Sequence, residues 1–393
     1  MEPEIQPPQP EALSKETGLD AVVAPPPVPP PAPADRDPWE TRAVRWVFLG
    51  SQGLRSGWSI LAFLLLYILL YLCIGLAFLK LHLVDKSFRF TADYVFFGDL
   101  ISFLGLVGAA SAVALIERRR SNLLAYNLTG PRPTLHFFQG LGMGFVALSV
   151  LVGAMYMGGW LQFGPVALSG VAAFRFAGLW AGAFLLVGCV EEGQFRCFLQ
   201  FTLTRGIDFW WALGIVALMC GDLLVRAKGN SVWGVYAMAL LGLVPCLLLQ
   251  LRKAEGAGFW QAAWVTSTLF GFIHTGNNGE TWIGIFAAAA IGFVFCVSVR
   301  VTGSAWWAIG CHAAWDWAET YFYGTADSGM VATGHYLTTR PVGNALWSGG
   351  TDGPEGSALV LGVLLLLLAV LLVIYGRRKP AALAAPGWEL AGG

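Results

Sequence analysis

The chain has 393 residues, of which 56% are hydrophobic and only 12% are charged. Soluble domains carry charge on about a quarter of their residues, so this composition excludes an ordinary water-soluble protein and predicts a helical protein that crosses the membrane repeatedly. Basic and acidic residues number 24 each, and the basic ones lie at the ends of apolar segments rather than in one stripe, which argues against a nucleic-acid partner.

Residues 1–45 are predicted to be a disordered, proline-rich cytoplasmic tail. The stretches PEIQPPQP and APPPVPPPAPADRDP hold too little apolar material to fold, so disorder or local polyproline II conformation is expected. A basic start followed by an apolar core is missing here, so we expect the first membrane helix to serve as its own, uncleaved signal.

Ten apolar segments are long enough to span a bilayer, which predicts an all-α, polytopic transmembrane bundle of about ten helices. These segments are residues 58–79, 95–116, 136–159, 176–204, 209–225, 231–251, 258–276, 281–300, 304–323 and 357–376. The weakest are 209–225, which is short and contains Asp222, and 304–323, which contains His312 and Asp316.

The distribution of Lys and Arg orients these segments. Most basic flanks fall on one side if both termini are cytoplasmic, which predicts that orientation. We expect a multi-pass protein of the plasma membrane. The residues that agree are Arg42, Arg45, Arg55, Arg118, Arg119, Arg120, Arg205, Arg252, Lys253, Arg300, Arg377, Arg378 and Lys379. Those that dissent are Lys80, Lys86, Arg89, Arg226 and Lys228.

The stretch from about 324 to 356 is rich in Gly, Ser and Thr. We expect it to be an exposed external loop that could act as a lid, with His335 as a solvated loop residue.

Three formal charges lie within six residues of one apolar segment, in Glu191-Glu192-Gly-Gln-Phe-Arg196. Charges at membrane depth are costly and indicate a functional site, although an internal ion pair that only holds helices together is the alternative. Glu192 and Arg196 are four residues apart with the acid first, the favourable order for a pair within one helix. Glu191 points about 100 degrees away around the helix and is left free to activate water.

Two further sites place imidazoles inside apolar segments. Phe270-Gly-Phe-Ile-His274 sets a histidine near the end of one segment, and a lone histidine there is also typical of an ordinary interfacial residue. His312-Ala-Ala-Trp-Asp316 has four-residue spacing, so the carboxylate can orient the imidazole, or the two can form a simple polar contact between helices.

A carboxylate and two imidazoles in one water-accessible cavity would supply a base, an oxyanion donor and a metal site for peptide hydrolysis. The usual protease motifs HExxH and GxSxG are missing. Asp99 and Asp222 could in principle form an aspartyl pair, but no local pattern supports one.

The ordered motifs Glu191-Glu192-x-x-x-Arg196, Phe270-x-x-x-His274 and His312-x-x-x-Asp316 resemble those of the CPBP family of intramembrane proteases. This family includes CAAX prenyl endopeptidases, Abi proteins and proteins like lysostaphin resistance protein A. The similarity covers about residues 120–330 and implies helices around an interior catalytic cavity. By this resemblance Glu191 and His274 would activate water.

The resemblance also implies supporting roles, in which Glu192 and Arg196 hold the site while His312 and Asp316 stabilise the oxyanion or bind substrate. Two departures from the family pattern are Cys197, where Gly is common, and Asp316, where Asn is common.

For the metal the family leaves two possibilities. One is a divalent ion such as zinc, held by Glu191, His274 and His312. The other is a metal-free, glutamate-dependent mechanism.

The sequence thus predicts an endopeptidase acting on a membrane-associated substrate, and the resemblance implies a prenylated CAAX protein as one such substrate. The alternatives are a proton-coupled transporter that uses Glu, His and Asp as a relay, a non-catalytic immunity or scaffold protein, and a bis-histidine haem protein. The predicted regions after the tail are N-terminal helices (46–135), a catalytic core (136–330) with an inserted helix pair at about 208–255, a loop (331–356), and a final helix with a basic tail (357–393).

Overall fold

The structure is a computed structural model that describes residues 39–50, 53–84, 90–117, 123–227, 229, 231–277 and 279–376. Most of the predicted proline-rich tail and the C-terminal basic tail lie outside the described residues, as do these flanking residues named above: Lys86, Arg89, Arg118, Arg119, Arg120, Lys228, Arg377, Arg378 and Lys379. Residues 1–47 form one unit, which contains most of helix α1 (Trp39–Phe48), and residues 48–393 form a second unit with all the features below.

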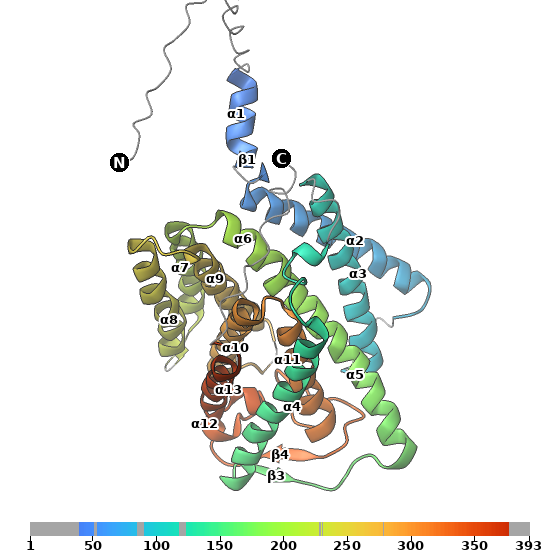
Figure 1. The fold of residues 1–393 in the computed structure, drawn as a ribbon. Helices are drawn as coiled ribbons and strands as arrows, with labels where there is room; N and C mark the ends of the chain where they lie inside the picture. The colour runs from blue at the N-terminus through green and yellow to red at the C-terminus, as the bar shows by residue number, and fades with distance from the viewer. Residues whose placement is uncertain are drawn as a thin grey trace, which may run out of the picture. The chain divides into compact units, whose positions relative to one another are not determined.

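The second unit consists almost entirely of helices (Figure 1). Its principal helices are α2 (Ser56–Lys80), α3 (Ala92–Ile116), α4 (Pro133–Met157), α5 (Gly170–Glu192), α6 (Gln200–Gly206), α7 (Phe209–Arg226), α8 (Ser231–Leu251), α9 (Ala257–His274), α10 (Trp282–Thr302), α11 (Trp306–Asp316) and α13 (Leu359–Tyr375). Two π-helical segments, η2 (Gly193–Leu199) and η3 (Trp317–Tyr323), continue α5 and α11.

Short elements connect these helices. They are η1 (Leu123–Ala125), α12 (Ala345–Ser348), η4 (Pro354–Gly356), and the antiparallel pairs β1 (Leu49–Gly50) with β2 (Gly53–Leu54) and β3 (Leu161–Phe163) with β4 (Thr339–Pro341). Side chains cap several helices: the Thr91, Asp208 and Thr281 oxygens accept backbone N–H groups at the starts of α3, α7 and α10.

The prediction of an all-α polytopic bundle is confirmed, because all ten predicted segments form helices. Seven helical stretches among the described residues are long and apolar enough to cross a membrane. They are α2, α3, α4, the continuous stretch from α5 to α6, α7, α8 and α10. Helix α13 is apolar but has 17 residues.

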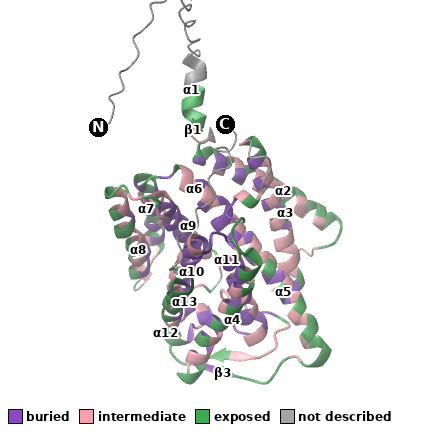
Figure 2. Ribbon diagram, in the orientation of Figure 1, coloured by how far each residue is buried: buried purple, intermediate pink, exposed green. Residues whose placement is uncertain are grey.

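Helices α9 and α11 are not among these spans, because α11 has only 11 residues and α9 carries several polar side chains. Most of their residues are enclosed by other helices, whereas α2, α7 and α8 expose much of their surface (Figure 2). An enclosed helix does not need a continuous apolar surface, since its polar groups find partners inside the protein.

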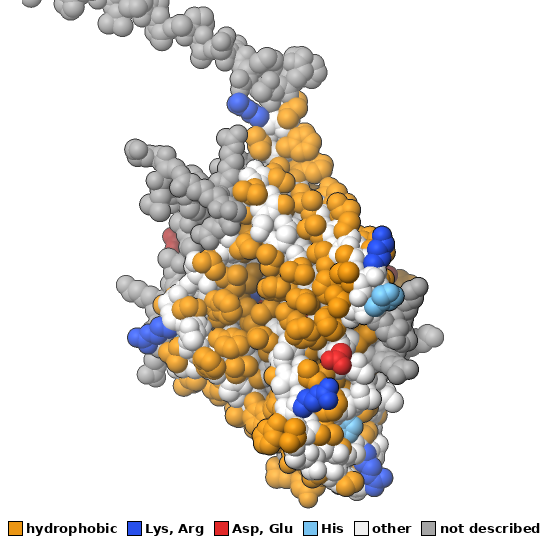
Figure 3. All heavy atoms as spheres, turned by 90° about the vertical axis from the view of Figure 1, so that its right-hand side faces the viewer, with side chains coloured by type: hydrophobic (Ala, Val, Ile, Leu, Met, Phe, Trp, Pro, Cys, Tyr) orange, Lys and Arg blue, Asp and Glu red, His pale blue; other side chains and the backbone are white. Residues whose placement is uncertain are grey.

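Apolar side chains cover the outer face formed by α2, α3 and α5 (Figure 3). On α2 the exposed members are Leu61, Leu64, Leu65, Ile68, Leu69, Leu72 and Leu76. Such a surface is stable against lipid rather than water, so the chain is an integral membrane protein.

Two apolar clusters both include residues of α10 and α11, and they hold these helices in place within the bundle. One joins them to α4 and α13 through buried residues such as Phe295, Trp307 and Leu371. The other joins them to α2 and η2 through the stacked rings of Phe63 and Phe198, whose centroids are 3.9 Å apart.

Glycines allow α4 and α11 to approach closely. A Cβ atom added at Gly140 would lie 2.9 Å from the Cys311 nitrogen, and one at Gly144 would lie 2.9 Å from the Cys311 carbonyl carbon. Gly310 likewise faces the backbone of Phe137. Small residues four apart are typical of close helix contacts in membranes, and this contact sets the position of His312.

The prediction that residues 324–356 form an exposed loop is only partly right: residues 343–347 are exposed, but other parts of the segment are not. Thr325, Ala332, Ser348 and Asp352 are buried, because the segment folds back onto the helices. Strand β4 pairs with β3, and the Asp352 carboxylate accepts hydrogen bonds from the Thr281 backbone N–H (3.0 Å) and hydroxyl (2.7 Å). His335 Nδ1 contacts the Ala332 carbonyl oxygen within the segment at 2.8 Å.

Candidate active site

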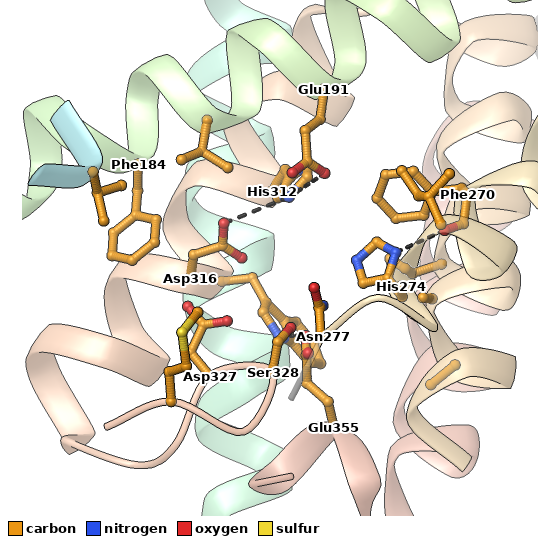
Figure 4. A pocket seen from close by; sticks show the side chains of 18 of the residues that line it. Phe184, Glu191, Phe270, His274, Asn277, His312, Asp316, Asp327, Ser328 and Glu355 are labelled. Carbon is orange, nitrogen blue, oxygen red and sulfur yellow. Dashed lines mark hydrogen bonds and ion pairs between the residues drawn. The ribbon is translucent and has the colours of Figure 1, made fainter. Parts of the chain in front are cut away.

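A cavity of about 360 Å³ lies among α3, α5, α9, α10, α11, α13 and the segment after η3. Four of the six predicted site residues line it: Glu191 from α5, His274 from α9, and His312 and Asp316 from α11 (Figure 4). Residues more than 120 positions apart in the sequence therefore share one chamber.

Two of the three motifs stand where an α-helix becomes a π-helix. Helix α5 ends at Glu192 and η2 begins at Gly193, while α11 ends at Asp316 and η3 begins at Trp317. A π-turn widens the helix and re-aims the side chains beside it, and such turns are frequent at functional sites.

The predicted pair of Glu192 and Arg196 forms in the protein interior. Arg196 Nε lies 3.2 Å from Glu192 Oε2 and its Nη1 lies 3.3 Å from Oε1, and both side chains are fully buried. The guanidinium also stacks on Phe270, 4.4 Å from the ring centroid, and the Arg196 carbonyl accepts a 2.7 Å hydrogen bond from Asn127. These contacts immobilise the pair.

Glu192 has a second partner that the sequence did not indicate. His312 Nδ1 lies 2.8 Å from Glu192 Oε1. An ionised carboxylate only accepts, so Nδ1 carries a hydrogen and donates it, which fixes the orientation of the ring. His312 Nε2 then faces the cavity, 3.7 Å from Glu191 Oε2 and 3.5 Å from Asp316 Oδ2, where the ion-pair contacts in Figure 4 are drawn.

Glu191 and Glu192 differ sharply in accessibility. The Glu191 side chain is 33% exposed and the Glu192 side chain is 0% exposed. The two adjacent carboxylates therefore point in different directions, as their helical spacing predicts. Glu192 is buried in the core, and Glu191 faces the cavity.

His274 occupies the opposite wall (Figure 4). Its Nδ1 lies 2.7 Å from the Phe270 carbonyl oxygen, so Nδ1–H is the donor. Nε2 is then the ring nitrogen that remains to accept a hydrogen bond. The imidazole is also 4.7 Å from the Phe270 ring, centroid to centroid. The spacing Phe270-x-x-x-His274 thus orients the imidazole from within one helix turn.

The predicted metal ligands Glu191, His274 and His312 do not converge tightly enough for an ion. Within the described ranges, no three His, Cys, Asp or Glu side chains form a group that could hold a metal. Zinc sites need donor atoms about 2.0–2.3 Å from the ion. His312 would offer an ion its Nε2, since Nδ1 donates to Glu192. As arranged in the described residues, the three side chains do not form a metal site.

The sequence missed acidic residues that line the same cavity, namely Asp327 and Glu355. Burial raises the pKa of the Glu355 carboxyl well above its usual range, with the nearby Asp327 carboxylate adding to the shift, and burial also raises the pKa of Asp327. Both residues come from the segment expected to be an exposed loop, where no local pattern marks them.

A third missed acid, Glu319, had a detectable signal. It lies seven residues after His312 and three after Asp316, so it continues the same helix face. Its Oε2 accepts a 3.0 Å hydrogen bond from Trp315 Nε1.

The two other acids considered from the sequence do not form an aspartyl pair. Asp99 lines the cavity, whereas Asp222 forms an exposed ion pair with Arg226 on α7.

Residues 173–318 match the model of a protein family described as type II CAAX prenyl endopeptidase Rce1-like. The matched range contains all six predicted site residues. Comparisons with curated proteins and with solved structures gave no match. The match confirms the resemblance drawn from the three motifs, and residues 173–318 are similar to the Rce1-like type II CAAX prenyl endopeptidases.

Proposed function

We propose that the chain hydrolyses a peptide bond of a membrane-associated substrate in this cavity, with Glu191 as the base that activates water. The observation that carries the proposal is the accessible Glu191 carboxylate, which lies beside His312 and faces His274 across one chamber. The family description suggests a prenylated CAAX protein as a substrate to test first.

In the proposed reaction Glu191 takes a proton from water while the water oxygen bonds to the substrate carbonyl carbon. His274 Nε2 accepts a hydrogen bond from the same water and orients it. The carbonyl oxygen becomes an oxyanion, which receives a hydrogen bond from the protonated Nε2–H of His312. The C–N bond then breaks, the nitrogen takes the proton from Glu191, and the carboxylate is regenerated.

Glu192, Arg196 and Asp316 would support this chemistry without touching the reacting bond. Glu192 accepts from His312 Nδ1–H, which keeps Nε2 aimed into the cavity, and Arg196 balances the Glu192 charge in the core. Asp316 lies 3.5 Å from His312 Nε2 and favours the charged imidazole. This division leaves Glu191 as the carboxylate that can exchange a proton with water.

Two features of the wider chain belong to the same proposal. Residues 136–330 form the catalytic core, and the pair α7 and α8 is an insertion in it. Among the described residues, neither helix lines the cavity, and the pair packs against α9 instead. We propose that both termini lie in the cytoplasm at the plasma membrane, and reporter fusions at each end would test this.

The test is cleavage of membrane-embedded peptides by the full chain in lipid nanodiscs. Glu191→Gln and His274→Gln should each lower kcat by about 10²- to 10⁴-fold, the usual contribution of a general base. Asp222→Asn, which alters an exposed acid on α7, is the matched control and should cleave normally. Full activity in a correctly folded Glu191→Gln variant overturns the proposal, and Glu191-dependent proton flux without cleavage would identify a transporter.

A further inference from the structure

Helix α10 carries none of the three motifs, yet it forms part of the cavity wall beside His312. Phe295 of this helix lines the cavity and is 2% exposed. Its ring stacks on the His312 imidazole, with the centroids 5.8 Å apart and the planes inclined by 25°. The reaction proposed above gives this ring no role, although it covers one face of the imidazole that donates to the oxyanion.

The same ring also contacts Arg196. The guanidinium carbon lies 5.4 Å from the Phe295 centroid, within the range of a cation–π contact. Glu192 Oε1 accepts from both His312 Nδ1 (2.8 Å) and Arg196 Nη1 (3.3 Å), so one carboxylate serves two positive groups when the imidazole is protonated. The negative face of an aromatic ring attracts a cation without offering an acceptor that competes for its N–H groups. Phe295 therefore stabilises both cations without drawing either of them away from Glu192.

Gly292, one turn earlier on α10, leaves the space in which the guanidinium lies. A Cβ atom added at Gly292 would be 2.5 Å from Arg196 Nη2 and 3.4 Å from the Ser267 Cα atom. Arg196 Nη2 is buried and has no hydrogen-bond partner within the part of the chain that the structure describes. This end of the guanidinium is thus positioned by the available space and by aromatic faces, and α10 supplies Gly292 and Phe295 to that arrangement.

A stacked ring restricts a motion that the hydrogen bond to Glu192 leaves open. That bond fixes one atom of the imidazole, Nδ1, about which the ring can still tilt. Phe295 on the face of the imidazole opposes the tilt, and the Phe270 ring stands nearly perpendicular to the imidazole at 6.2 Å. His312 Nε2 therefore keeps its direction into the cavity, where it lies 3.7 Å from Glu191 Oε2.

We propose that Phe295 is a positioning residue of the active site, which holds the plane of the His312 imidazole so that Nε2–H points at the oxyanion. This proposal rests on the proposed function, because Phe295 acts through His312 and does not touch the reacting bond. Gly292 serves the same arrangement by leaving room for the Arg196 guanidinium on the ring.

The experiment measures kcat and KM of the full chain in lipid nanodiscs for the membrane-embedded peptide that the wild type cleaves fastest, with rates expressed per folded protein. Phe295→Leu removes the ring and keeps an apolar side chain. It should lower kcat by about 3- to 30-fold, the rate equivalent of a desolvated cation–π contact, and leave KM within about 2-fold. Phe295→Tyr keeps the aromatic face and should restore most of the rate.

Two comparisons separate positioning from packing. Phe293→Leu is the matched control, because it removes a ring from the same helix that lies 5.9 Å from the Trp260 ring and outside the cavity lining. Its kcat should equal that of the wild type. In a His312→Gln background, Phe295→Leu should lower kcat no further, since the ring acts through the imidazole. A ring needed only for packing would lower the rate in both backgrounds.

A folded Phe295→Leu variant with wild-type kcat overturns the inference and leaves the protease in place, as do equal losses in the two backgrounds. If Phe295→Leu does not fold, Phe295→Met, which is closer to Phe in volume, takes its place. Failure of both variants to fold assigns the ring to packing and also overturns the inference. A wild-type chain that cleaves none of the peptides overturns the proposed function, and the inference with it.

Discussion

The contact between α4 and α11 gives a sharp test of how the fold positions the site. A methyl group at Gly144 would lie 2.9 Å from the Cys311 carbonyl carbon and 3.1 Å from its Cα atom. Both are backbone atoms, so no side chain can rotate away, and the two helices must separate by several tenths of an ångström or more. Overpacking of this kind costs about 1–3 kcal/mol.

The same displacement reaches the site, because Cys311 directly precedes His312. Misplacement of a catalytic group by about 1 Å costs on the order of 10²-fold in rate. We therefore expect Gly144→Ala to destabilise the protein and to lower kcat/KM by about 10- to 100-fold.

Gly142→Ala is the matched control, since a Cβ at Gly142 has nothing within 4 Å. Both variants gain the same helix propensity from alanine, so their difference reports the steric clash alone. The assays are thermal unfolding in detergent and peptide cleavage. Equal unfolding temperatures and equal rates for Gly144→Ala and Gly142→Ala would show that this contact does not position α11.

Three further predictions concern charge. Arg196→Met leaves the Glu192 carboxylate buried without its cation, so unfolding in denaturant should show a loss of about 3–5 kcal/mol, and wild-type stability would contradict the buried pair. Burial and the Asp352 charge raise the pKa of Glu280 to about 8, so the folded chain keeps a proton that the unfolded chain releases from about pH 4.5 upward. Stability should therefore fall as the pH rises from 5 to 8, less steeply in Glu280→Gln; identical pH profiles would refute this. Finally, dialysis against a chelator should leave kcat/KM unchanged, and activity restored only by added zinc would reject the metal-free route.

Local spacing predicted the parts of the site that lie within one helix. The ion pair of Glu192 with Arg196 and the proximity of His312 to Asp316 both follow from residues four apart on a helix. Hydropathy located all ten helices, since long apolar segments are a strong signal, although α9 and α11 are enclosed rather than exposed to lipid.

Contacts between distant residues could not be predicted in the same way. The hydrogen bond from His312 to Glu192 joins helices 120 positions apart and depends on how closely α4, α5 and α11 pack. No local sequence pattern marks the π-turns after Glu192 and Asp316. Residues 324–356 have the composition of a surface loop, but tertiary contacts such as that of Asp352 with Thr281 hold the segment against the helices.

The most direct test of the central claim is the single-turnover rate of peptide cleavage by Glu191→Gln. Gln has nearly the same shape as Glu but cannot accept a proton from water, so substrate binding should persist while the rate falls by about 10²- to 10⁴-fold. Binding of a fluorescent peptide to the same variant would confirm that the cavity is intact. A Glu191→Gln variant that cleaves at the wild-type rate would show that another group activates the water.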